Sequence, residues 1–119
     1  MGEPDPASRP RIPKIRGTQV GLSNPKQIDQ IKADMLAGRF DYAASRVYGF
    51  RDAKGIYYVR IGHHRMAAAM EIYRETGDPA ILLTLLAWGE FVPRETAPND
   101  ARPLPSRHWW GALRNLLRF

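Results

Sequence analysis

Residues 57–69 constrain the possible folds of this chain more than any other stretch. They consist of a strand-like run, a glycine and a helix-like run. Apolar residues alternate over 57–61, a pattern typical of a half-buried strand. Gly62 ends the alternation and permits a tight backbone turn. From Met66 onward, apolar side chains recur at helical spacing. The sequence therefore predicts a strand that leads directly into a helix.

Three side chains that can bind an anion occupy this junction: His63, His64 and Arg65. The first backbone N–H groups of a helix lack partners within the helix and carry partial positive charge, which favours a phosphate group. A guanidinium adds charge-assisted hydrogen bonds, and an imidazole can exchange protons near neutral pH. The junction is therefore the predicted functional site of the chain.

Capping and turn residues predict the neighbouring elements. Asn24 and Pro25 are typical of a helix start, and Gly38 is typical of a left-handed helix end. Two β-prone runs, 45–50 and 56–61, are separated by a loop that ends in glycine, which predicts a hairpin. The hairpin would carry the chain directly into the junction.

The remaining elements are predicted from weaker patterns. Residues 13–20 are expected to form a short edge strand, and the helix after the junction is expected to end at Gly77. The apolar run 80–91 fits a buried helix or a buried strand, and we predict a strand because a crossover after the preceding helix would return it to the sheet. Proline-rich residues 92–105 are predicted to be a loop, and Ser106 to cap a last helix over 106–118.

With 119 residues, the chain is long enough for one domain with its own core. We expect a flexible leader over 1–12 and a single α/β domain over 13–119, with a small mixed sheet and flanking helices. The absence of cysteine excludes disulfides, thiolate catalysis and cysteine-bound zinc. No apolar run reaches the length of a membrane span, so no membrane partner is expected.

The net charge of +6 and the isoelectric point near 10.1 favour a polyanionic partner such as nucleic acid. The sequence contains no P-loop, no dinucleotide fingerprint and no His-Glu-x-x-His zinc motif. Adjacent histidines on a helix diverge by about a quarter turn, so His63 and His64 do not form a metal site by themselves. No metal-ligating residues are predicted.

The motif Gly62-His63-His64-Arg65, followed by an alanine run, resembles the ParB/sulfiredoxin superfamily. That family places a Gly-x-x-Arg box between a strand and a helix and uses it on phosphates of nucleotides or nucleic acids. Because His63 stands at the position of the sulfiredoxin cysteine, sulfiredoxin redox chemistry does not carry over. The order of Thr18-Gln19 and then the Gly-His-His-Arg motif is more similar to the ParB-like nuclease branch, and the resemblance covers residues 13–91.

Residues 103–117 are similar to the ends of some polymorphic toxins, the C-terminal effector domains of Rhs and contact-dependent inhibition proteins. This resemblance implies a toxin domain that is secreted with a larger parent protein and delivered into the cytoplasm of a target bacterial cell. It also implies a cognate immunity protein as a partner.

The leading functional hypothesis is a nuclease that cleaves phosphodiester bonds in DNA or RNA. Arg65 and Gly62 at the helix N-terminus would hold the phosphate, one of His63 and His64 would transfer protons, and Gln19 would position the substrate or the attacking water. Further phosphate contacts are expected from two residues of the first predicted strand, Arg16 and Thr18.

Two alternatives stay open. The same residues could bind the triphosphate of ATP or CTP in a nucleotide-dependent enzyme, which would ordinarily need Mg²⁺. They could also contact phosphate without catalysis, in a nucleic-acid-binding module. Whether the nuclease itself uses Mg²⁺ is open at this point.

Overall fold

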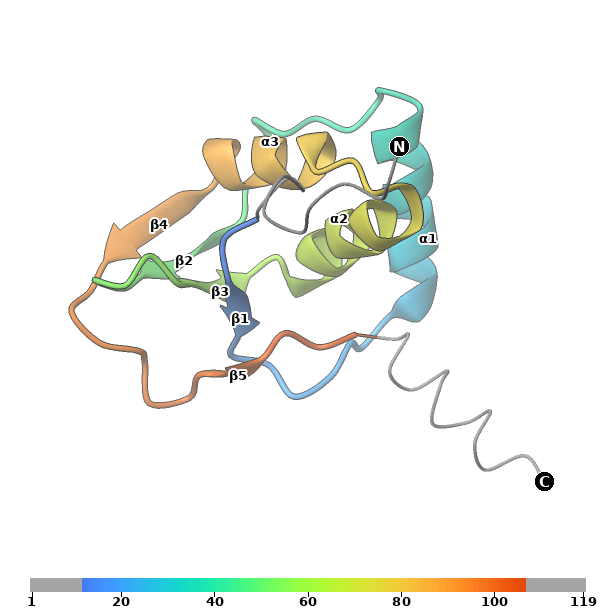
Figure 1. The fold of residues 1–119 in the computed structure, drawn as a ribbon. Helices are drawn as coiled ribbons and strands as arrows, with labels where there is room; N and C mark the ends of the chain where they lie inside the picture. The colour runs from blue at the N-terminus through green and yellow to red at the C-terminus, as the bar shows by residue number, and fades with distance from the viewer. Residues whose placement is uncertain (1–11, 107–119) are drawn as a thin grey trace, which may run out of the picture.

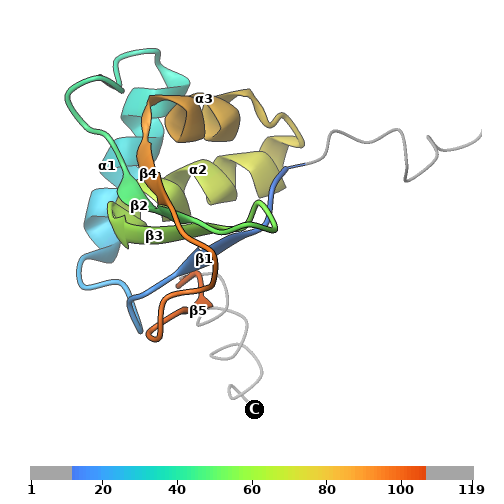
Figure 2. The same cartoon turned by 90° about the vertical axis from the view of Figure 1, so that its left-hand side faces the viewer.

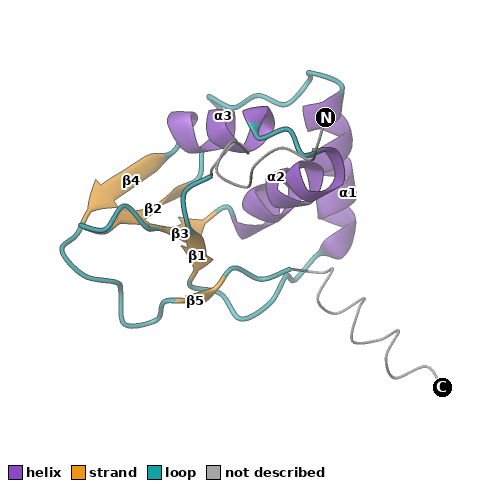
Figure 3. Ribbon diagram, viewed as in Figure 1, coloured by secondary structure: helices purple, strands orange, loops and turns teal. Residues whose placement is uncertain are grey.

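The computed structural model of the chain describes residues 12–106, in which three helices lie on one side of a mixed sheet (Figures 1 and 3). The elements in chain order are β1 (Ile15–Gly17), α1 (Pro25–Leu36), β2 (Tyr48–Arg51), β3 (Tyr57–Ile61), α2 (His63–Thr76), α3 (Ala80–Trp88), β4 (Glu90–Pro93) and β5 (Arg102–Pro103). The predicted leader over 1–12 and the predicted helix over 106–118 lie outside the described residues, apart from Ile12 and Ser106. The expected mixed sheet with flanking helices is confirmed.

The strand order of the sheet is β4-β2-β3-β1-β5. The pairs β1–β3 and β2–β4 are parallel, while β2–β3 and β1–β5 are antiparallel. The prediction of an edge strand over 13–20 is wrong, because β1 ends at Gly17 and is flanked on both sides. Its outer neighbour β5 has only two residues in a proline-rich segment, so the sequence pattern did not predict it.

Local signals gave the right bounds for the first two helices. The Asn24 side chain accepts a hydrogen bond from the backbone N–H of Gln27, and Pro25 occupies the first turn. Gly38 and Gly77 follow the helix ends with φ of 72° and 74°, a left-handed conformation that favours glycine. The hairpin between β2 and β3 is also confirmed, with Gly55 in the same left-handed region.

The prediction of one strand over 80–91 is wrong. Residues 80–88 form α3, and the strand β4 begins only at Glu90. Leu82, Leu85 and Leu86 are buried at helical spacing, while Leu83 is 41% exposed, so the leucines cover one face of a helix rather than both faces of a strand. The predicted loop over 92–105 likewise contains the end of β4 and all of β5. The chain still returns to the sheet after the helices, since β4 pairs parallel to β2.

The hydrophobic core lies between the helices and one face of the sheet. Two perpendicular views show that the helices cover this face (Figures 1 and 2). Tyr57 and Val59 of β3 contribute to this core, and Phe91 contributes from β4. Tyr58 and Arg60 alternate with them and therefore face away from the helices. None of the helices within residues 12–106 is long and apolar enough to cross a membrane.

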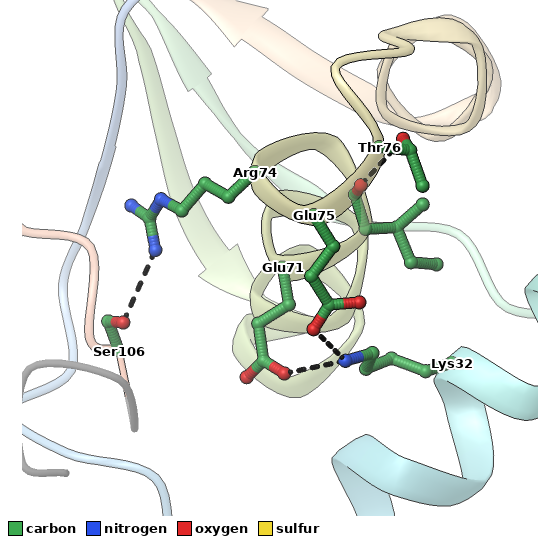
Figure 4. Close-up of polar contacts among 7 residues, drawn as sticks. Lys32, Glu71, Arg74, Glu75, Thr76 and Ser106 are labelled. Atoms are coloured by element: carbon green, nitrogen blue, oxygen red, sulfur yellow. Dashed lines mark hydrogen bonds and ion pairs between the residues drawn. The ribbon is translucent and has the colours of Figure 1, made fainter.

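The interface between α1 and α2 contains a compact ion-pair cluster (Figure 4). The Lys32 Nζ atom lies 3.1 Å from Glu71 Oε1 and 2.6 Å from Glu75 Oε1. Glu71 is buried, with a side chain only 2% exposed. Burial alone would lower the pKa of Lys32, but the hydrogen bonds to Glu75 and Glu71 outweigh it and raise that pKa. One ammonium group therefore pairs with both carboxylates of this interface.

Candidate anion-binding site

A cavity of about 290 Å³ opens where the parallel strands β1 and β3 end and α2 begins. The carboxyl ends of parallel strands are a common place for ligands in α/β sheets. Eight residues line the cavity: Gln19, Gln27, Arg60, Ile61, Gly62, His63, His64 and Arg65. The structure therefore brings the predicted Gln19 to the predicted strand–helix junction, although the two are separated by more than forty positions in the chain.

Gly62 occupies the turn between β3 and α2 with φ of 102°. A Cβ atom here would lie 3.1 Å from Val47 Cγ2 and 3.2 Å from Arg65 Nη1. The left-handed backbone therefore favours glycine, and the close neighbours leave little room for a Cβ atom. This geometry places the first turn of α2 at the cavity.

His63 is buried, and its ring ties the end of β1 to α2. The backbone N–H of Thr18 donates a hydrogen bond of 3.1 Å to His63 Nε2. Burial lowers the pKa of His63 below 6.5, and the neighbouring positive charges of His64 and Arg60 lower it further. A neutral ring whose Nε2 accepts a hydrogen bond carries its proton on Nδ1. The lone pair that a general base needs is thus already engaged.

His64 also accepts a backbone hydrogen bond, at the opposite end of the segment 18–24 that begins with Thr18. The backbone N–H of Asn24, the N-cap residue of α1, donates a hydrogen bond of 3.0 Å to His64 Nε2. The two histidines thereby hold residues 18–24 at both ends. His64 is less buried than His63 and lines the cavity, and its Nδ1 atom has no hydrogen-bond partner among residues 12–106. In the neutral ring, Nδ1–H is therefore a donor for a ligand.

The N-termini of two helices meet at this cavity. Gln27 belongs to the first turn of α1, and His63 and His64 open α2. The bond between Asn24 and His64 holds the two helix starts together, across 40 positions of the chain. Each helix start contributes partial positive charge from N–H groups that lack partners within the helix. No acidic residue is among the eight that line the cavity.

Two arginines add full positive charge. Arg65 Nη1 donates a hydrogen bond of 3.1 Å to the backbone oxygen of Arg46, which fixes the guanidinium beneath Gly62. Arg60 forms a two-pronged ion pair with Asp100, including an Nη2–Oδ1 distance of 3.2 Å. Hydrogen bonds from Arg60 lower the pKa of Asp100, and both side chains stay exposed to solvent. The cavity thus combines fixed and exposed cationic groups.

The remaining predicted contacts lie at the edge of the site or outside it. Gln19 lines the cavity, and its amide nitrogen also donates to the backbone oxygen of Gly21. Thr18 lies outside the cavity wall, and its hydroxyl donates a hydrogen bond of 2.9 Å to the backbone oxygen of Val59. Arg16 lies opposite Tyr58 in the register of β1 and β3, and it is not among the residues that line the cavity. The structure therefore brings Gln19, but not Thr18 or Arg16, to the cavity wall.

Sequence reasoning missed two residues of the cavity, Arg60 and Gln27. Arg60 stands two positions before Gly62 on a predicted strand, so its nearness to the junction was available as a signal. Gln27 was predicted only as part of a helix start, and nothing local indicates that this start meets α2. No group of three potential metal ligands occurs within the described part of the chain.

Comparisons with known proteins identify no matching family model, no similar curated protein and no similar solved structure.

Proposed function

We propose that the domain is a nuclease and that this cavity binds the phosphate at which it cleaves a polynucleotide. The observation that carries the proposal is the composition of the cavity: two arginines, two histidines and two helix N-termini converge there, and no lining residue is acidic. A phosphodiester group is an anion of suitable charge for such a site. The basic character of the whole chain supports the same class of substrate.

The positive groups would bind the phosphate and stabilise the charge that develops on its oxygens. Arg65 is the best-positioned full charge, because its bond to the Arg46 backbone fixes it next to the start of α2. Fixed donors of this kind stabilise a transition state without having to reorganise during the reaction. Arg60 would contribute after exchanging its partner Asp100 for substrate.

The two histidines have different roles in this proposal. His63 is a positioning residue, because its buried ring is engaged with the Thr18 backbone. His64 can donate from Nδ1 to a phosphate oxygen in the arrangement seen. To act as an acid it must also be protonated at Nε2, and to act as a base it must free one nitrogen lone pair. Proton transfer by His64 therefore requires release of the Asn24 N–H.

The occupied Nε2 atoms favour one alternative, a nucleic-acid-binding module without catalysis. A glutamine at position 64 separates the two functions. Its amide oxygen can accept the Asn24 N–H and its amide nitrogen can donate to phosphate, but it does not transfer protons near neutral pH. His64→Gln thus keeps the hydrogen bonds and removes the acid–base chemistry.

The test is incubation of the purified chain with plasmid DNA, total RNA and ATP separately, each with Mg²⁺ and with EDTA. We expect cleavage of a nucleic acid that falls by at least about a hundredfold in His64→Gln, the size typical of a lost acid or base. Cleavage at the original rate in a folded His64→Gln protein contradicts proton transfer by His64. Phosphate release from ATP with intact nucleic acids would instead support the nucleotide-dependent enzyme.

We further propose that the domain acts as a toxin inside a target bacterial cell, after delivery by a parent Rhs or contact-dependent inhibition protein. The resemblance of residues 103–117 to polymorphic toxins supports this proposal. Induced expression in a bacterial cytoplasm should arrest growth, and His64→Gln should restore it. Normal growth at a confirmed level of the unaltered chain would contradict the toxin role.

A further inference from the structure

The sheet face away from the helices carries an aromatic ring, Phe50, with two guanidinium groups close to it. The Cζ atom of Arg60 lies 5.4 Å from the centre of the Phe50 ring, and that of Arg94 lies 5.0 Å from it. Guanidinium groups at this distance are attracted to the ring, and a stacked guanidinium can still donate hydrogen bonds from its N–H edge.

The strand register places these groups on one surface. Phe50 is paired with Tyr58 of β3 and with Val92 of β4, so the three side chains share a face. Arg16 of β1 is paired with Tyr58 and lies on the same face. The helices pack on the opposite face (Figure 2). Val92 is 58% exposed, and Arg60 and Arg94 are exposed as well.

The charge of this surface is only partly compensated. Arg60 pairs with Asp100, whereas neither Arg16 nor Arg94 forms an ion pair with a described residue. Tyr58 is buried on this face and Phe50 is half-buried, so the exposed part of the surface consists of Val92 and the arginine side chains. Arginine edges next to such a partly apolar surface are complementary to a chain that carries both phosphates and flat bases.

The surface is continuous with the candidate site, because Arg60 belongs to both. Its guanidinium stacks near Phe50, and the same residue lines the cavity that contains His64 and Arg65. A polymer bound along the sheet would therefore reach the cavity at the carboxyl end of β3.

We propose that Arg60, Phe50, Arg94 and Arg16 form a binding track that holds a single-stranded polynucleotide and leads it to the cavity. The track extends the proposed function, on which the identity of the ligand rests. A single strand can place a base against the guanidinium groups that stack on Phe50, whereas the bases of a duplex are stacked on one another. Asp100 occupies the N–H edge of Arg60 that a phosphate would take, so it competes with the ligand.

The experiment measures fluorescence anisotropy of a short labelled oligonucleotide with phosphorothioate linkages, in EDTA, as single-stranded DNA, single-stranded RNA and duplex. The variants are Arg94→Ala and Asp100→Asn, with Arg39→Ala as the matched control. Arg39 is an exposed arginine next to Asp34 of α1, so its loss changes the net charge equally at a different surface.

We expect Arg94→Ala to weaken single-strand binding about fivefold and to reduce the salt slope of log K by about 0.7, the value for one lost phosphate contact. Asp100→Asn should strengthen binding, since it frees Arg60. Opposite signs from two surface variants do not arise from partial unfolding. Arg39→Ala should leave affinity and slope nearly unchanged, and the duplex should bind more weakly than either single strand.

Equal effects of Arg94→Ala and Arg39→Ala would overturn the track, as would a duplex that binds as tightly as the single strands or an absence of any binding. These results are independent of cleavage, because the probe resists it and EDTA is present. Loss of binding in Arg94→Ala without cleavage of any substrate would keep the track and refute the nuclease. Cleavage that depends on His64, together with unaffected binding in Arg94→Ala, would keep the nuclease and refute the track.

Discussion

The helices α1 and α2 form two polar clusters with each other, and the two differ in charge balance. At the helix starts, Asn24 and Gln27 of α1 meet His63 and His64 of α2 beside a cavity. About two turns further along, Lys32 meets Glu71 and Glu75. The hydrogen bond from the Asn24 N–H to His64 joins the two helix starts, so both N-termini lie at the same side of the molecule. Cationic groups and positive helix ends accumulate there, while two carboxylates pair with Lys32 further along.

This difference indicates that the Lys32 cluster is structural and that the cavity at the helix starts binds a ligand. Lys32 and its two glutamates satisfy one another, and Glu71 is buried (Figure 4). The groups at the helix starts face a cavity with no acidic residue in its wall. Asp100 pairs with Arg60 from outside the cavity wall, but no described acidic residue pairs with Arg65. Buried charges are paired in folded proteins, and a cavity with such an excess of positive groups is most simply completed by an anion. The predictions below test this distinction from the largest expected effect to the smallest.

Lys32→Met should destabilise the fold by about 3 kcal/mol, because it removes the cation from a buried carboxylate. The free energy of unfolding is measured by urea titration at neutral pH. Arg39→Ala, which removes the cation of an exposed pair with Asp34, should cost less than about 0.5 kcal/mol. An equally small effect of Lys32→Met would mean that the cluster is not structural. Nucleic-acid affinity of folded Lys32→Met should be unchanged, which separates the two clusters.

Gly62→Ala should destabilise the fold by about 2 kcal/mol, because alanine strains the left-handed backbone and its Cβ meets Val47 and Arg65. It should also weaken nucleic-acid binding, since the start of α2 and the Arg65 guanidinium would shift. Gly38→Ala is the control: φ is 72° there, but nothing lies within 4 Å of the new Cβ. If both variants lose only stability, then the close contact at Gly62 does not shape the cavity.

His63 should make stability depend on pH, with a less stable fold in acid. Its pKa in the folded protein is depressed below 6.5, so the unfolded chain binds a proton more readily. The stabilisation is therefore complete above pH 6.5 and is lost as the pH falls through the lower folded value. The measurement compares urea unfolding of the unaltered chain and of His63→Gln across this range. A constant difference between the two proteins would show that His63 does not contribute through its titration.

Local patterns predicted a large part of the fold and of the site. The helix start at Asn24-Pro25, the hairpin loop before Gly55 and the turn at Gly62 follow from capping and backbone preferences that act within a few residues. Segments without capping residues or turn glycines were predicted wrongly. The leucines of 80–88 fit two structures equally well, and β5 is too short and too rich in proline to be predicted.

The sequence by itself determined where a strand turns into a helix and which cationic side chains stand at that turn, because these depend on neighbours in the chain. Only the tertiary structure decided what those side chains do. It engaged His63 and His64 with backbone groups 45 and 40 positions away and brought Arg60 and Gln27 to the same cavity. The physical reason is that a hydrogen bond or a charge acts across space, and partners so distant in the chain meet only after the sheet and the helices α1 and α2 have packed together.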